Sequence, residues 1–150
     1  MCYYTSEMAC PYFQPVERRL EGLGPASAIL PLGDAWSGVC RASAGAPWQP
    51  GDAQLQSLCS FGYARGRCDR FPQDDSGPDA VRFTINQDDD SSIGLYYVQE
   101  RDHHPFAHGP LEYSQATNRF LQQPGDEILA CQAEAYIRSY LRRRTEALAR

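Results

Sequence analysis

The sequence contains no lysine, because all 14 of its basic residues are arginine. Without a lysine amine the chain cannot form a Schiff base with a carbonyl substrate or with pyridoxal phosphate. It also lacks the glycine, serine and histidine motifs of nucleotide-binding loops, α/β-hydrolases and zinc proteases. These absences weigh against the common nucleotide-dependent and hydrolytic enzymes.

Long apolar runs are missing too. The most apolar stretch, residues 26–32, is interrupted by Pro31 and is too short to span a bilayer. Residues 1–10 show no basic segment followed by an apolar one, which is the pattern of an export signal. We therefore expect a soluble cytoplasmic protein. Its net charge of −5 weighs against general binding to nucleic acid or to an anionic membrane.

Four of the six cysteines share a similar neighbourhood, rich in aromatic residues, glycine or proline. These four are Cys10, Cys40, Cys59 and Cys68. Thiols gathered in a chain without an export signal more often hold a metal or a cluster than form a set of disulfides. We therefore predict that these four cysteines form one cofactor-binding and metal-ligating site.

The cysteine spacing favours an iron–sulfur cluster over zinc. Structural zinc sites usually take two ligands from a tight C-x2-4-C turn, which this sequence lacks. A [4Fe–4S] cluster holds its thiolates at separate corners, so ligands from distant loops suit it better. Zinc, free thiols and disulfides stay open as alternatives.

Several neighbours of the four cysteines are expected to support the site. We predict that Gly33, Gly38, Gly62 and Gly66 allow backbone N–H groups to approach the sulfurs. Water would be excluded by the aromatic residues Tyr12, Phe13, Trp36, Phe61, Tyr63 and Phe71. Arginine would offset an anionic cluster, and the candidates are Arg41, Arg65, Arg67 and Arg70.

The other two cysteines are interpreted differently. Cys131 falls within a predicted helix, where a small buried cysteine is most often a core residue. Seven residues separate Cys2 from Cys10, so Cys2 could replace one of the four ligands or ligate a second metal.

The pattern of the chain predicts a single loop-rich α+β domain over residues 1–150. Residues 1–72 form its cysteine-rich half, with one short helix capped by Asp52 and stopped by Gly62. The polar run 73–79 is predicted to be a surface loop. Residues 80–150 follow, with an antiparallel hairpin of strands 81–85 and 93–99, whose residues alternate at period two.

A long C-terminal helix is expected from about Asp126, after Pro124 and Gly125. Apolar residues at helical spacing predict its buried face, namely Leu129, Ala133, Tyr136, Ile137, Tyr140, Leu141 and Leu148. The run Arg142-Arg143-Arg144 is interpreted as a solvated helix end, where positive charge complements the helix dipole.

All three histidines lie in one short segment that begins Asp102-His103-His104 and includes His108. After a strand, Asp-His-His resembles the motif that names the DHH phosphoesterases, which implies metal-dependent hydrolysis through Asp102, His103 and His104. That family also needs aspartates after parallel strands. The other interpretations are a surface metal site at His104 and His108, and a hydrogen-bonded loop that caps the cysteine site.

The sequence thus predicts a small iron–sulfur protein that carries electrons or senses oxygen or redox state, together with a redox or regulatory protein partner. No paired acid and base is visible, so we do not expect an enzyme. The alternative is a zinc-stabilised module for protein interactions, and a small metal-dependent hydrolase is the third hypothesis.

Overall fold

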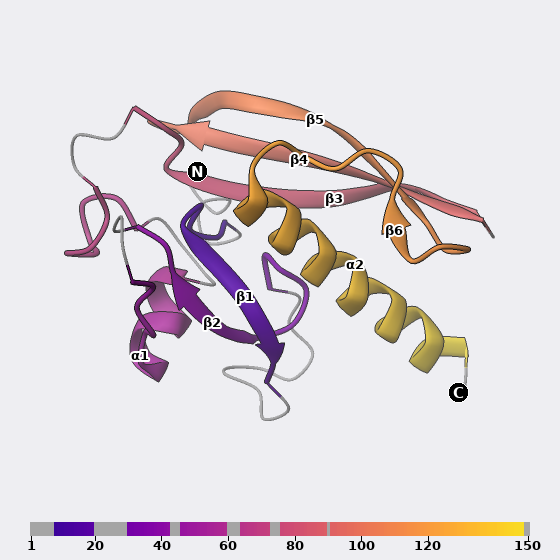
Figure 1. Ribbon diagram of the computed structural model, residues 1–150, viewed down its shortest axis with the longest axis horizontal. Helices are drawn as coiled ribbons and strands as arrows, with labels where there is room; N and C mark the ends of the chain where they lie inside the picture. Colours follow the sequence, from indigo (N-terminus) through magenta and orange to yellow (C-terminus); the bar gives the residue numbers. More distant parts are fainter. Residues whose placement is uncertain are drawn as a thin grey trace.

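The structure is a computed structural model that describes residues 8–19, 30–42, 46–59, 64–72, 76–89 and 91–148. Its strands and helices are, in chain order, β1 (Phe13–Arg18), β2 (Trp36–Cys40), α1 (Asp52–Gln54), β3 (Ala80–Asp88), β4 (Ser92–Arg101), β5 (His104–Ser114), β6 (Arg119–Phe120) and α2 (Glu127–Leu148). β1 pairs with β2, and the other strands form a second antiparallel sheet in the order β3-β4-β5-β6. The α+β class predicted from the sequence is confirmed (Figure 1).

The predicted hairpin is present as β3 and β4, which pair from Ala80 and Glu100 to Asp88 and Ile93. Both strands are longer than predicted, and the turn is correspondingly shorter. The Asp89 carboxylate holds this turn by accepting hydrogen bonds from the backbone N–H groups of Ser91 and Ser92. A short polar side chain that accepts bonds in this way stabilises a tight connection.

β4 continues into β5 through a two-residue turn at Asp102 and His103, whose φ angles are 53° and 63°. Two successive positive φ angles define the type I′ turn, which matches the right-handed twist of the strands it joins. β5 was not predicted, because two prolines interrupt its pattern and most of its residues are exposed. The Asp-His-His segment is therefore the tip of an antiparallel hairpin.

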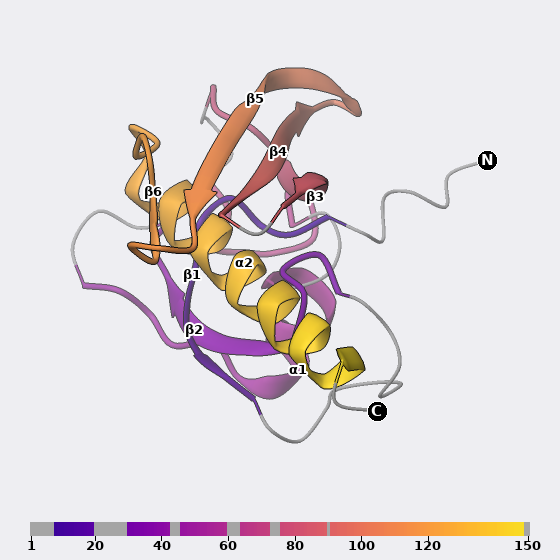
Figure 2. The ribbon, with the colours of Figure 1, turned by 90° about the vertical axis from the view of Figure 1, so that its right-hand side faces the viewer.

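α2 begins where the sequence predicts, since the carboxylate of Asp126 accepts hydrogen bonds from the N–H groups of Ile128 and Leu129. The helix lies beneath the four-stranded sheet and alongside β1 (Figures 1 and 2). Its buried residues join those of the sheet in one core that includes Val81, Phe83, Ile93, Leu95, Leu129, Ala133 and Ile137. No helix in the described ranges is both long and apolar enough to cross a membrane.

The prediction of the buried face of α2 is wrong at the C-terminal end of the helix. Leu148 is 82% exposed, at the C-terminal end of α2, where the helix slopes away from the large sheet (Figure 1). The same face buries two polar side chains instead, those of Gln132 and Ser139.

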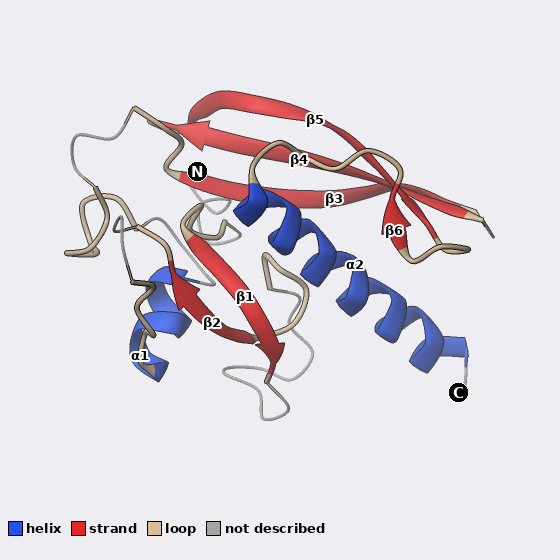
Figure 3. Ribbon diagram, viewed as in Figure 1, coloured by secondary structure: helices blue, strands red, loops and turns tan. Residues whose placement is uncertain are grey.

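β1 and β2 form a hairpin within the segment that the sequence predicts to be loop-built, so that expectation is wrong in part. The strands pair from Phe13 and Cys40 to Arg18 and Trp36, with a bulge between Pro15 and Glu17. Gly38 is required there, because a Cβ atom at this position would lie 2.0 Å from the carbonyl oxygen of Gln14. Figure 3 shows this small sheet beside α2 and apart from the larger one.

The short helix also departs from its prediction. Asp52 is the first helical residue and Gly51 is the N-cap, which has no side chain to make a capping bond. After one α-turn the backbone widens into a π-helical turn, Leu55–Cys59. Gly62, the predicted stop, lies outside the described residues.

The carboxamide of Gln132 ties α2 to the start of β1. Its Nε2 atom donates hydrogen bonds to the carbonyl oxygens of Cys10 and Phe13, each at 2.8 Å. Gln132 is 1% exposed, so water does not compete for these bonds. A single buried side chain thereby orders the turn that presents Cys10.

The arginine run of α2 is not a solvated helix end, so that interpretation is wrong. Arg142 and Arg143 both bind the carboxylate of Asp34, which is 8% exposed. Arg144 binds Asp88 at the end of β3 at 2.7 Å. Charge-assisted hydrogen bonds therefore join the end of α2 to the segment before β2 and to the end of β3.

Asp79 is likewise no surface-loop residue, although the sequence places it in the polar run 73–79. It is 3% exposed, pairs with Arg65, and accepts a hydrogen bond at 2.9 Å from the N–H group of Asp102. Residues 73–75 of that run lie outside the described residues. The carboxylate of Asp79 joins the cysteine-rich half to the β4–β5 turn.

The Gln132 contact predicts a large stability effect. Gln132→Leu keeps the side-chain volume but leaves two buried carbonyl groups without partners, so the free energy of unfolding should fall by about 2–4 kcal/mol. Urea denaturation followed by circular dichroism measures this change. Glu134→Gln, on the exposed side of the same helix, should change it by less than about 0.5 kcal/mol. Equal stability of Gln132→Leu and the parent would contradict the assignment.

The Asp34 network predicts a dependence on pH. Burial acts to raise the pKa of Asp34, but hydrogen bonds from Arg142 and Ser139 outweigh it and lower the pKa below the ordinary value of 3.8. The ionised carboxylate thus stabilises the fold above that pH, and this contribution is lost as the pH falls through the lowered pKa. Asp34→Asn should therefore be less stable near neutral pH, and the difference should vanish in acid. A difference that does not depend on pH would contradict this account.

Candidate functional site

All four predicted cysteines line one small cavity, which we call the cysteine pocket. Its remaining walls are mostly apolar and consist of Phe13, Ala42, Trp48, Gln54, Leu58, Ala64 and Phe71. The cysteines come from the turn before β1, the end of β2, the end of the π-helical turn and the loop beyond it. All four are free thiols, so none is spent on a disulfide.

Backbone hydrogen bonds fix the positions of these cysteines relative to each other. The N–H of Cys10 donates to the carbonyl of Cys59 at 3.0 Å, which joins two segments far apart in sequence. Cys40 forms a two-way bridge with Trp48, at 2.6 and 3.1 Å. The N–H of Cys68 donates to Ala64 at 2.7 Å, closing the turn that carries this cysteine. The pocket is therefore built by main-chain contacts that hold without a bound group.

The four thiols differ in depth. Cys10 and Cys59 are each 7% exposed, whereas Cys40 and Cys68 are half-buried and reach the surface. Burial, followed by the nearby thiols of Cys40 and Cys68, raises the pKa of Cys59 to about 12. Burial also raises the pKa of Cys10, and the other three thiols add to the increase. The two deep thiols therefore remain protonated at neutral pH while no cation lies beside them.

One polar side chain of the cysteine pocket contacts a sulfur, and two arginines contact aromatic residues of its wall. Gln54 donates a hydrogen bond from Nε2 to the Cys68 sulfur at 3.1 Å. The guanidinium of Arg70 lies 4.0 Å from the centre of the Trp48 ring, a cation–π contact over the pocket wall. That of Arg65 lies 4.6 Å from the ring centre of Phe71. Donors and positive charge at this position would stabilise ionised sulfur.

Some neighbours predicted from the sequence lie elsewhere. Gly33 packs against Ser139 of α2, Gly38 packs against β1, and Trp36 donates its indole N–H to Leu32. Gly66, with a φ of 83°, does lie in the turn that leads to Cys68. Phe61, Gly62 and Tyr63 are outside the described residues, as is Cys2.

Sequence reasoning missed several residues of the pocket wall, and Trp48 and Gln54 are the two with polar groups. Trp48 is eight residues after Cys40, and its link to that cysteine appears only when residues 40 and 48 form a bridge. Gln54 was passed over within the short helix, although its spacing of one helical turn from Leu58 places both on one face.

The size of the cavity bears on what it can hold. Its volume is about 10 Å³, close to the minimum needed for one water molecule. In the part of the chain that the structure describes, no three His, Cys, Asp or Glu side chains are grouped so that they could hold a metal ion. The donor set of four thiols suits a soft metal or an iron–sulfur cluster, but a cluster requires the pocket to open.

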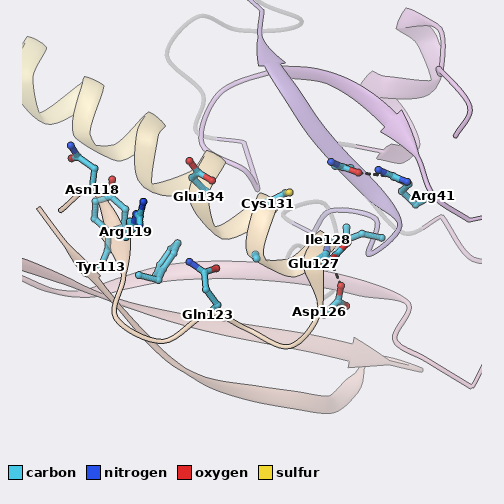
Figure 4. Close-up of a pocket in the computed structure, with 13 residues that line it drawn as sticks. Arg41, Tyr113, Asn118, Arg119, Gln123, Asp126, Glu127, Ile128, Cys131 and Glu134 are labelled. Atoms are coloured by element: carbon cyan, nitrogen blue, oxygen red, sulfur yellow. Dashed lines mark hydrogen bonds between the residues drawn. The ribbon is translucent and has the colours of Figure 1, made fainter.

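Cys131 lies outside the cysteine pocket, and its interpretation as a core residue is wrong. It is half-buried on α2 and lines a separate groove of about 990 Å³ (Figure 4). Burial, followed by the charges of Glu134 and Glu127, raises the pKa of its thiol. The figure shows Glu134 one turn further along the helix and Arg41 across the groove. A raised pKa does not suit a nucleophilic cysteine.

The Asp-His-His segment does not cap the cysteine pocket, whose walls include none of its residues. His104 and His108 are four residues apart on one strand, about 13 Å, which is too far to share one metal ion. His108 instead contacts the hydroxyl of Tyr96. The antiparallel sheet around this turn also differs from the parallel sheet that the phosphoesterase resemblance implies.

Comparison with protein families, with curated proteins and with solved structures finds no match to the chain. The functional argument therefore depends on the geometry of the site.

The depth of the thiols predicts the order of their chemical modification. In metal-free protein, iodoacetamide at mildly alkaline pH should alkylate Cys40 and Cys68 well before Cys10 and Cys59, because only thiolates react and the deep thiols stay protonated. Mass spectrometry of peptides after timed quenching measures the order. Denatured protein, in which all cysteines should react at similar rates, is the control. Early labelling of Cys10 would contradict the described burial.

Proposed function

We propose that the cysteine pocket binds an iron–sulfur cluster, [4Fe–4S] in type, through Cys10, Cys40, Cys59 and Cys68. The observation that carries this proposal is the arrangement of four free thiols from four separate segments around one apolar cavity. A cluster takes each of its ligands at a separate iron, which suits thiols that come from four separate segments.

The proposed role is redox, either as an electron carrier or as a sensor of oxygen or redox state. Cys40 and Cys68 reach the surface, so a cluster held by them would lie within reach of an electron-transfer partner or of dissolved oxidants. Cys10 and Cys59 would hold its inner side in an apolar wall, where the hydrogen bond from Gln54 and the arginines Arg65 and Arg70 would moderate the negative charge.

A zinc-stabilised interaction module is the second candidate. The observation in its favour is the small cavity of about 10 Å³, since a single ion enclosed by its own ligands needs little additional space. The two candidates therefore differ in the metal that the purified protein would contain.

Metal analysis of protein purified without oxygen tests the proposal. We expect brown protein that contains iron and acid-labile sulfide in equal amounts. Colourless protein with stoichiometric zinc would support the second candidate, and colourless protein with neither metal would reject both. A reversible one-electron change on reduction would indicate a carrier, whereas loss of the cluster on exposure to air would indicate a sensor.

Single cysteine variants test the ligand set. Serine at Cys10, Cys40, Cys59 or Cys68 should remove or convert the cluster, because a hydroxyl is a poorer ligand for iron than a thiolate. Cys131→Ser is the matched control and should keep its iron and its visible spectrum. Full retention of iron in any of the four would show that another residue is the ligand, with Cys2 as the next to test.

A further inference from the structure

A second polar groove, unrelated to the cysteine pocket, lies between the inner face of the large sheet and the loop that joins β6 to α2. Its volume is about 830 Å³. The floor is made by β4 and β5, and the opposite wall by residues 121–126 of the loop. In Figure 1 this loop passes from β6 back toward the start of α2, crossing the strands in that view. The groove therefore lies between elements that are fixed in the fold.

Gln99 points a polar group into this groove without a protein partner. The residue is 8% exposed, and it lines the groove from β4. Among the described residues, no side chain or backbone group forms a hydrogen bond with its carboxamide. Among the described residues, Arg143 Nε is a fully enclosed side-chain atom without a hydrogen-bond partner. The amide of Gln99 is not enclosed in this way, so it faces the open groove. A buried carboxamide in this state is poised to bond a ligand or water.

Other side chains that line the groove also carry carboxamide groups. Four further carboxamides line the groove, from Asn86, Gln87, Gln122 and Gln123. Of these, only Gln87 has a side-chain hydrogen bond within the described residues, a long one of 3.4 Å to Asp89. Each carboxamide offers both donors and an acceptor. The groove is thus lined by several carboxamides that can both donate hydrogen bonds to a ligand and accept them from it.

An aromatic ring lies on the floor of the groove. Tyr97 pairs with Gly109 on the neighbouring strand, and a Cβ atom at Gly109 would lie 3.3 Å from the tyrosine ring. The glycine therefore leaves room for the ring to lie across β5. A ring in this position supplies an apolar surface beside the carboxamides.

The charges of the lining decide which ligands it suits. Among the described residues, no arginine or histidine lines the groove, so a phosphate, sulfate or carboxylate would find no cationic partner there. The carboxylate of Asp126 already caps α2, which leaves Glu112 as an exposed acceptor on the rim. A peptide that adds a strand to the sheet is disfavoured, because Pro105 and Pro110 remove backbone donors from β5.

We propose that this groove binds a neutral saccharide. Sugar hydroxyls both donate and accept hydrogen bonds, as do the carboxamides that line the groove, and the apolar C–H face of a sugar ring can pack on Tyr97. A neutral ligand also agrees with the absence of cationic side chains. Gln99, the deepest of the polar groups, determines the affinity, because its bonds form away from competing water.

Titrations with defined oligosaccharides test the proposal on the intact chain. Maltotriose, cellotriose, mannotriose and triacetylchitotriose are added in turn to ¹⁵N-labelled protein, with a sulfated trisaccharide as the anionic comparison. At least one neutral probe should bind saturably with a Kd in the millimolar range or below, and shift the signals of Tyr97, Gln99 and Gly109. Saturation by the sulfated probe alone, or by no probe at millimolar concentration, would overturn the proposal.

Matched variants separate binding from folding. Gln99→Leu should weaken the neutral probe about tenfold. Gln49→Leu, the same change at an exposed position outside the groove, should leave the Kd unchanged. Because Gln99 has no protein partner to lose, Gln99→Leu should keep or raise the melting temperature of the parent. A clear drop in melting temperature, or an unchanged Kd, would show that Gln99 is structural and reject the site.

Discussion

The buried carboxamide of Gln132 is the contact on which the candidate site depends. By donating to the carbonyl groups of Cys10 and Phe13, it joins the longest helix to the turn that begins β1. The backbone N–H of Cys10 in turn donates a hydrogen bond to the carbonyl of Cys59, and Phe13 pairs with Cys40 across the small sheet. Three of the four pocket cysteines are thus positioned by a chain of contacts that begins on α2. The helix supplies order to a segment with little regular structure of its own.

Charge pairs complete the connection between the two parts of the molecule. Asp34, near β2, binds Arg142 and Arg143 at the far end of α2, while Asp88 of the large sheet binds Arg144. Asp79 pairs with Arg65 in the loop that leads to Cys68. Because Asp34 and Asp79 are buried, their pairs constrain geometry more than an exposed pair would. The cysteine pocket is therefore built from segments that α2 holds in place, through Gln132 near one end of the helix and Arg142 and Arg143 near the other.

The cysteine pocket and the carboxamide-lined groove use opposite chemistry in one small fold. In the pocket, apolar walls surround soft sulfur donors, and the buried thiols stay protonated until a cation replaces the protons. In the groove, uncharged amides and a tyrosine ring face a wider space that has no cationic lining. The large sheet forms the floor of the groove, whereas the pocket is built around the small sheet and the loops beside it.

The sequence by itself determined the elements whose signals are local. Period-two alternation marks β3 and β4, and helical spacing with Asp126 as the cap marks α2, because each pattern is complete within a short stretch. The shared neighbourhoods of Cys10, Cys40, Cys59 and Cys68 also single out the residues that line one cavity. Tertiary structure alone decided the pairing of β1 with β2, the burial of Asp34 against Arg142, the different depths of the thiols, and the unpaired amide of Gln99. These features arise from contacts between residues far apart in the chain, whose partners no local pattern specifies.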